Sequence, residues 1–324
     1  MNFWDKLLRP IIGQAPLYDV TDAAFRQMVA RYGKPDVMFT EFVSADGLMH
    51  PKGREKLLRE LYFTEAERPI VAQLFSSRPD KMREAAKFCA ELGFDGIDIN
   101  MGCPDETIEK QGSGANLIKY PELAQELIKA AKECGLPVSV KTRLGYNQID
   151  LDWLNKLLEA KPAALIIHLR TRKEMSKVPA HWEVMPEIMK LAEGSGVLIL
   201  GNGDIKTPAE ARQKCKETSC DGVLIGRAIF GQPWLYNLEV QPPSGEERLK
   251  IMLEHTKLFA ALYLPGETNT KLFNGHTKSF AVMKKHFKAY VEGFPASPAG
   301  RPGAAELRSK LMEANSVEEV EKLL

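Results

Sequence analysis

The residues whose types and spacing most clearly suggest chemical reactivity surround Cys103, in the segment 98–104. The apolar run 94–99 predicts a short buried strand, and the polar residues that follow end it. Gly102 permits an unusual backbone angle and Pro104 fixes the next one, so the thiol is displayed on a corner. This placement is typical of a reactive group, although a lone cysteine is as often only a small buried hydrophobic residue.

Three chemical roles are open for Cys103. A metal ligand would need partner ligands at a useful spacing, which the sequence lacks, so we expect no metal. A nucleophile would need a nearby base, and His168 is the candidate. As a general acid, a thiol with a pKa of about 8.5 keeps its proton at neutral pH and releases it in a transition state, which suits protonation of a carbon beside a carbonyl.

Cationic side chains follow two other predicted strands. Lys141 and Arg143 alternate with apolar or small residues at a strand end, so both point to the same side. Buried charge needs a partner, which is either an anionic ligand, such as the N1–C2 carbonyl edge of a reduced flavin, or a neighbouring carboxylate. His168 ends another strand and is followed by Arg170 and Arg172, which either face phosphates or are solvated loop charges.

Glycine-containing strand ends predict a phosphate site. Gly226 and Arg227 follow one apolar run, and the segment 201–204 ends the preceding one. Small residues let backbone N–H groups approach an anion, and a helix start and an arginine add positive charge. The alternative is a pair of tight turns that need glycine only for their geometry.

A basic and aromatic segment lies near the C-terminus and has no acidic residue between Lys271 and Glu292. Such a pattern is suited to gripping a nucleic-acid backbone and stacking on bases. Equally, it is typical of an amphipathic helix with lysines in solvent and aromatic rings in the core. The residues concerned are Lys271, Phe273, His276, Lys278, Phe280, Lys284, Lys285, His286, Phe287, Lys288 and Tyr290.

These residues are positioned by alternating apolar runs and amphipathic segments. The predicted strands are 10–15, 36–40, 69–75, 94–99, 137–143, 163–168, 197–202 and 222–227. Eight strand–helix units of this size predict a (β/α)8 TIM barrel, with a doubly wound open sheet as the rival. The barrel is favoured because it brings separate strand ends to one mouth, and polar residues lie at those ends: Gln73, Asn100, Lys141, His168 and Asn202.

The strand pattern stops near residue 240. Helices are predicted over 246–264, 280–292 and 304–324, with loops around 265–266 and over 293–303. We therefore expect a barrel domain, 1–240, and a C-terminal all-helical domain, 241–324.

The composition restricts which partners and which cellular compartment we expect. The 324 residues carry a formal net charge of +1, so nucleic-acid binding would depend on local patches. The five cysteines include no CxxC pair, which argues against a disulfide framework or structural zinc and fits a reducing, cytoplasmic compartment. No apolar run is long enough to span a bilayer, and the N-terminal residues lack a signal-peptide layout.

Together these motifs resemble the tRNA-dihydrouridine synthases over nearly the whole chain. The strongest element is 100–104 followed by 112–117. The supporting elements are 20–22 with Phe25 and Arg26, Lys141 with Arg143 and Gly145, His168 with 170–172, 201–204, and 226–228.

The resemblance implies an FMN barrel with a helical RNA-binding domain that acts on tRNA, and a monomer suits an enzyme that must wrap RNA. FMN, reduced by NADPH, would deliver hydride to C6 of a uridine, and Cys103 would protonate C5. FMN would be held by Pro16, Leu17, Tyr18, Gln73, Lys141, His168, Asn202, Gly203, Asp204, Gly226 and Arg227. Substrate contacts would come from Asn100, Arg143, Arg170, Arg172, Lys284 and Lys285.

The chain departs from the family pattern near the expected flavin. Leu17, Tyr18 and Asp19 stand where methionine, a small residue and glycine are common, and Leu169 replaces a frequent glycine. Two other functions fit part of the pattern. One is an FMN barrel acting on a free pyrimidine, such as a dihydroorotate dehydrogenase; the other is an RNA-binding protein without catalysis. The basic helical extension argues against the free-pyrimidine enzyme, because a free base needs no RNA clamp, and loading with FMN would distinguish the tRNA enzyme from the RNA-binding protein.

Overall fold

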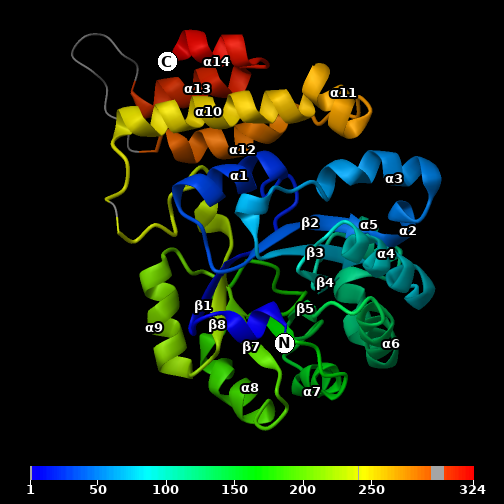
Figure 1. Cartoon of the computed structure of the whole chain (residues 1–324). Coiled ribbons are helices and arrows are strands. Elements are labelled where there is room, and N and C mark those ends of the chain that lie inside the picture. Colours follow the sequence, from blue (N-terminus) through cyan, green and yellow to red (C-terminus); the bar gives the residue numbers. More distant parts are fainter. Residues whose placement is uncertain (1, 240, 293–302) are drawn as a thin grey trace.

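Eight parallel strands form one curled sheet in the computed structural model, which describes residues 2–239, 241–292 and 303–324 (Figure 1). The sheet order is β1-β8-β7-β6-β5-β4-β3-β2. Backbone hydrogen bonds from Gln14 to Val37 and from Asp36 to Ile12 join the two remaining edges. The strands are β1 Ile11–Gln14, β2 Met38–Ser44, β3 Ile70–Phe75, β4 Gly96–Met101, β5 Val138–Arg143, β6 Ala164–His168, β7 Leu198–Asn202 and β8 Gly222–Ile225.

The predicted barrel is therefore confirmed in its strands and their order, with small differences at the ends. β2 continues to Ser44, beyond the predicted end at residue 40, and its register with β3 shifts between Phe39 and Phe42. Such an irregularity bends a strand and redirects its side chains. β8 ends at Ile225, so Gly226 and Arg227 lie just past it.

Helices surround the sheet, because each crossover between parallel strands runs back along its outer face (Figure 1). Side-chain caps begin several of them, as when Asp22 accepts the backbone N–H of Phe25 at 2.9 Å. The α-helices are α1 Ala23–Tyr32, α2 Ala45–Leu48, α3 Pro51–Leu57, α4 Pro79–Glu91, α5 Glu106–Lys110, α6 Pro121–Lys132, α7 Leu151–Glu159, α8 Met185–Leu191 and α9 Pro208–Thr218. Short 3-10 helices span Phe3–Lys6, Leu58–Glu60, Glu65–Glu67, Gly114–Lys119, Trp182–Val184 and Arg227–Ile229.

Alternate strand residues belong to different layers of the core. Ile167 and Ile199 pack in the layer that includes the surrounding helices, whereas Ile166 and Leu200 belong to a second cluster with Trp4. Two residues further along the same strand faces, Ile166 is followed by His168 and Leu200 by Asn202, both of which line a cavity. The face that carries this second cluster therefore changes from apolar to polar toward the carboxyl ends of the strands.

Helices beyond residue 244 form a separate layer that lies over α1 (Figure 1). They are α10 Gly245–Tyr263, α11 Glu267–Phe273, α12 Ala281–Tyr290, α13 Ala304–Glu313 and α14 Val317–Leu323. α11 was not predicted, and the single helix expected over 304–324 is two helices. Most of the expected loop 293–303 lies outside the described residues.

The helical layer shares its core with the barrel. Ala24 and Met28 of α1 belong to the same apolar cluster as Phe259 and Phe287. The Tyr263 hydroxyl also accepts the backbone N–H of Ala23 at 3.0 Å. The division into domains 1–240 and 241–324 stays a prediction. Within the described ranges, no helix is long and apolar enough to cross a membrane.

Candidate active site

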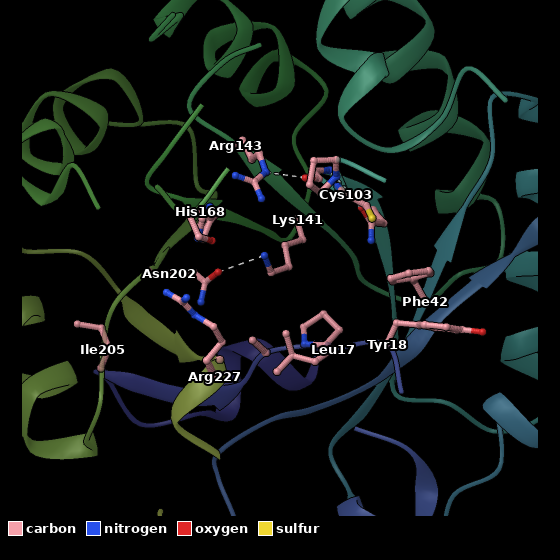
Figure 2. A pocket seen from close by; sticks show the side chains of 18 of the residues that line it. Leu17, Tyr18, Phe42, Cys103, Lys141, Arg143, His168, Asn202, Ile205 and Arg227 are labelled. Atoms are coloured by element: carbon pink, nitrogen blue, oxygen red, sulfur yellow. Dashed lines mark hydrogen bonds between the residues drawn. The ribbon is translucent and has the colours of Figure 1, made fainter. Parts of the chain in front are cut away.

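A cavity of about 800 Å³ opens at the carboxyl ends of the strands (Figure 2). Its volume is within the range of small-molecule and cofactor sites. The predicted site residues that line it are Pro16, Leu17, Tyr18, Gln73, Asn100, Cys103, Lys141, Arg143, His168, Asn202, Gly203, Asp204, Gly226 and Arg227. The barrel thus brings together residues that are up to about two hundred positions apart in sequence.

Cys103 shares this cavity with the cationic and polar strand ends (Figure 2). Its backbone is fixed on both sides: its N–H donates to Asn100 Oδ1 at 2.9 Å, and its carbonyl accepts from Ala115 N–H at 2.9 Å. Arg143 Nε donates to the carbonyl oxygen of Gly102 at 2.7 Å. An added Cβ at Gly102 would approach the Thr142 backbone to 3.1 Å, so the corner favours a glycine there.

A line of buried hydrogen bonds supports the cysteine corner from below. Asp98 accepts from Ser139 Oγ at 2.6 Å and from Gln73 Nε2 at 2.7 Å. Gln73 Oε1 then accepts from Asn100 Nδ2 at 3.1 Å, which turns Asn100 Oδ1 toward Cys103. Burial raises the pKa of Asp98 to about 6, so this carboxylate is ionised at neutral pH and only accepts hydrogen bonds.

The Cys103 thiol is protonated at neutral pH. Burial is the main cause that raises its pKa above the ordinary value for cysteine, and the nearby cations Arg143 and Lys141 offset this only partly. A protonated thiol is suited to donate a proton rather than to attack as a thiolate. Of the three roles considered above, this favours the general acid. Among the described residues, no group of three or more His, Cys, Asp or Glu side chains is placed to hold a metal ion.

Lys141 crosses the cavity floor toward Asn202, and Nζ donates to Asn202 Oδ1 at 3.2 Å (Figure 2). Burial lowers the pKa of Lys141 to about 8, and repulsion from Arg143 adds to this effect. Asn202 is held in turn because its Nδ2 donates to the Leu224 carbonyl at 2.8 Å. A bound anion would stabilise the charged form of Lys141, because its negative charge offsets the burial of the ammonium and the repulsion from Arg143.

His168 is a neutral imidazole at neutral pH, because burial and then the charges of Arg143 and Lys141 lower its pKa well below the ordinary value. Its Nε2 lies 3.4 Å from Arg170 Nη1, and its buried Nδ1 has no hydrogen-bond partner among the residues that the structure describes. Buried polar atoms normally have partners, so this orphaned nitrogen is suited to a ligand.

Asp204 lies between two arginines at the cavity wall. It forms ion pairs with buried Arg170 and, at 3.2 Å, with exposed Arg227. The hydrogen bond from Arg170 is the main cause that lowers the pKa of Asp204. The cavity lining has Lys141, Arg143, Lys206 and Arg227 against the single carboxylate of Asp204, so it suits an anionic ligand such as a phosphate ester.

Four predicted substrate residues lie outside the cavity lining. Arg170 is buried behind Asp204, and Arg172 forms an ion pair with Glu109. Lys284 and Lys285, on α12, contact Asn315 at 3.2 Å and Asp19 at 3.3 Å.

The basic and aromatic C-terminal segment is divided between surface and core. Lys278 is buried and forms ion pairs with Glu41 and Glu60 at 2.5 and 2.6 Å, which corrects the hypothesis that it faces nucleic acid. The aromatic rings are also in the core, so they do not stack on bases: Phe273, Phe280, Phe287 and Tyr290. The carboxylates that pair with Lys278 are distant in sequence, and no local pattern reveals them.

Sequence reasoning missed several cavity residues. Phe42 would have been found by extending the second strand, since its apolar run continues past Glu41. Ser176, Ile205 and Lys206 lie on loops, where no periodic pattern identifies the residues that turn inward.

The observed residues fit a flavin mononucleotide. The cationic excess suits its phosphate and the anionic edge of its ring, and the unpartnered His168 Nδ1 offers a polar contact. The added Cβ of an alanine at Gly226 would find only ordinary contacts at 3.8 Å or more, which leaves open space beside that backbone.

The fold and site define a parallel α/β barrel with a ligand cavity at the carboxyl ends of its strands. Two solved barrels are similar in fold: the old yellow enzyme homologue of Zymomonas mobilis (TM-score 0.50, 15% identity, 72% of this chain and 91% of that one) and histamine dehydrogenase from Rhizobium sp. 4-9 (TM-score 0.53, 15% identity, 76% and 49%).

Sequence comparison places the chain in a particular family. The dihydrouridine synthase (Dus) family model matches residues 13–324, so the chain belongs to that family. Curated relatives include "Probable tRNA-dihydrouridine synthase 2" of Bacillus subtilis (strain 168), 41% identical over 100% of this chain and 95% of that protein. "Probable tRNA-dihydrouridine synthase" of Staphylococcus aureus (strain COL) is also 41% identical, over 100% and 94%.

Proposed function

We propose that this protein is a flavin-dependent tRNA-dihydrouridine synthase that reduces the C5=C6 bond of uridines in tRNA. The observation that carries the proposal is the protonated thiol of Cys103, which lines the same cavity as Lys141, His168 and Asn202. A proton donor beside a cationic flavin-sized site is what reduction of an activated carbon–carbon double bond requires.

The flavin would lie between two groups of residues. Lys141, His168 and Asn202 at the strand ends would contact the ring, and the loops carrying Gly203 and Arg227 would hold the phosphate. Pro16, Leu17, Gln73, Asp204 and Gly226 complete the proposed cofactor set, together with the backbone of Tyr18, whose ring extends away from the cavity centre (Figure 2). When bound, the reduced FMN supplies the hydride for C6 of the uracil, and NADPH supplies its electrons.

Cys103 then donates its thiol proton to C5, and Asn100 keeps the thiol in place through the Cys103 backbone. We keep Asn100 and Arg143 as contacts to the uracil or its phosphate. Arg170 and Arg172 instead hold the carboxylates of Asp204 and Glu109. The uridine must leave the RNA stack to reach this half-buried thiol inside the cavity, as enzymes that act on bases generally require.

The helical region 241–324 would grip the body of the tRNA, with Lys284 and Lys285 contacting its backbone. These side chains lie on α12, and Lys285 reaches Asp19 beside the cavity. The proposed enzyme acts as a monomer in the cytoplasm, where its tRNA substrate is found.

The test uses purified protein, FMN, NADPH and tRNA that contains no dihydrouridine. We expect dihydrouridine to appear in the tRNA, with oxidation of one NADPH per base. Orotate and free uracil serve as competing substrates. Reduction of free orotate without modification of tRNA would contradict the proposal, and so would tRNA binding by a protein that cannot be loaded with FMN.

A further inference from the structure

We infer that Tyr18, backed by Phe42, is a stacking platform for the nucleobase next to the reduced uridine. This inference rests on the proposed function and names a second contact with the same RNA. The two rings stack with their centroids 5.0 Å apart and their planes 19° from parallel. Phe42 covers one face of the tyrosine, yet 51% of Tyr18 is exposed. A ring that is covered on one face and open to the cavity rim on the other can take a nucleobase on its open face.

The platform has a defined place relative to the chemistry. Tyr18 and Phe42 both line the cavity that contains Cys103. In Figure 2 they lie on the side of the cavity below Cys103, and the ring of Tyr18 extends away from the cavity centre. A uracil placed beside the Cys103 thiol would therefore not stack on Tyr18, whereas an adjoining base outside the cavity would reach it.

The backbone on both sides of Tyr18 is fixed, so the ring is presented in advance of binding. Leu17 N–H donates to Thr21 Oγ1 at 2.9 Å, and Asp19 N–H donates to Glu41 Oε1 at 2.6 Å. Glu41 is held in turn by the buried Lys278 at 2.5 Å. Phe42 itself packs edge-on against Phe75, with centroids 5.8 Å apart. Such preorganisation lowers the entropic cost of binding.

Charge around the platform also suits a nucleotide. Lys285 lies 3.3 Å from Asp19 and its side chain is 43% exposed, so its ammonium is available to a phosphate next to the stacked base. Burial, followed by the charge of Asp19, raises the pKa of Tyr18, which keeps its hydroxyl neutral and free of repulsion toward the RNA. Stacking accepts any base, because every base has an aromatic face.

The experiment compares three variants of the FMN-loaded enzyme. Tyr18→Ala removes the ring, Tyr18→Phe keeps it, and Tyr120→Ala removes a tyrosine of matching exposure, 53%, that does not line the cavity. The measurements are the Kd for unmodified tRNA, the flavin content and NADPH oxidation. In a second arm, 2-aminopurine replaces the base on either side of the modified uridine, once that uridine is mapped, and its fluorescence reports stacking.

We expect Tyr18→Ala to weaken tRNA binding about 10-fold or more, which is the size of one lost base–aromatic stack. Quenching of 2-aminopurine should disappear at one neighbouring position, while Tyr18→Phe and Tyr120→Ala behave as the wild type. Flavin content and NADPH oxidation should not change in any variant.

Two results would overturn the platform: unchanged affinity and quenching in Tyr18→Ala, or loss of flavin from that variant, which would assign Tyr18 to the cofactor. The proposed function fails separately, if the wild-type enzyme forms no dihydrouridine. The tRNA affinities still test the platform in that case, because binding needs no turnover.

Discussion

Asn100 Oδ1 accepts the backbone N–H of Cys103 at 2.9 Å, and the same oxygen accepts the N–H of Gly102 at 3.1 Å. An amide oxygen, and not the amide nitrogen, must therefore face the cysteine corner. The orientation is set two residues away, because ionised Asp98 can only accept and so turns Gln73 Nε2 toward itself. Gln73 then presents its oxygen to Asn100 Nδ2.

Asp98→Asn should disturb this line of hydrogen bonds. The new amide can accept from Gln73 Nε2 only if its own nitrogen faces Ser139 Oγ, which must then accept instead of donate. In the other orientation two amide nitrogens meet, and turning Gln73 over to avoid this places Asn100 Nδ2 against the N–H of Cys103. We expect a loss of about 1–3 kcal/mol in unfolding free energy and slower dihydrouridine formation with unchanged flavin content. Ser139→Ala is the control, since it removes one donor to Asp98 without reversing the amides. Equal kcat values in Asp98→Asn and wild type would refute the role.

Asp98 also predicts a pH dependence of stability. Its pKa is about 6 in the folded protein, above the ordinary 3.8, so between these values the folded state binds more protons than the unfolded state. The contribution of Asp98 therefore falls as pH rises from about 4 to 6. In urea unfolding, the wild-type free energy of unfolding should include a decrease from about pH 4 to pH 6 that Asp98→Asn lacks. An identical pH dependence in the two proteins would contradict the assignment.

Cys103→Ala should abolish proton donation without disturbing the flavin. General acid catalysis is typically worth about 10²–10⁴-fold in rate, so dihydrouridine formation should fall by that factor. Flavin absorbance and NADPH oxidation should remain. Cys134→Ala is the matched control, because that thiol is also half-buried but lies outside the cavity. Undiminished dihydrouridine formation in Cys103→Ala would remove this residue from the mechanism.

Lys141 should make flavin binding depend on pH. Its pKa of about 8 in the ligand-free protein means that the side chain is charged below this pH and neutral above it. Binding of an anionic flavin should therefore weaken as pH rises through about 8, by up to about tenfold per pH unit. The Lys141→Met variant should bind FMN weakly at every pH, so its FMN affinity should not change with pH. Quenching of FMN fluorescence measures both, and a flat wild-type profile would contradict the prediction.

Lys278→Met should destabilise the protein, since it leaves Glu41 and Glu60 buried without their shared cation. Breaking a buried ion pair in this way costs about 3–5 kcal/mol. This loss of unfolding free energy should become smaller at acidic pH, because protonation of Glu41 and Glu60 removes their uncompensated negative charge. Lys284→Met, which changes a partly exposed lysine that is hydrogen-bonded to Asn315, serves as the control. Equal urea midpoints for the two variants at neutral pH would show that the cluster is not stabilising.

Lys285→Ala should weaken tRNA binding without affecting the flavin. If the lysine contacts one phosphate, the slope of log Kd against log salt should fall by about one. The Lys284→Ala variant tests the neighbouring side chain in the same way. Lys156→Ala on α7 is the control, with a similar exposure of 45%. An unchanged slope in both α12 variants would place the RNA on another surface.

The sequence alone was sufficient for the barrel and for most of the cavity. Short apolar runs ending in Gln73, Lys141, His168 or Asn202 predict parallel strands with polar carboxyl ends, and a barrel has only one mouth for them. Because strand direction and side-chain alternation follow from local pattern, these positions needed no knowledge of distant contacts.

Tertiary structure alone decided which charges are buried and with whom they pair. In the sequence, Lys278 is one of several basic residues near the C-terminus. In the structure it is buried and forms ion pairs with Glu41 and Glu60, which lie more than two hundred positions earlier. The stacking of Tyr18 on Phe42 likewise depends on how a loop meets the extended end of β2. Long-range partners of this kind leave no periodic signal, because the chain separation between them is set by the fold and not by a helix or strand repeat.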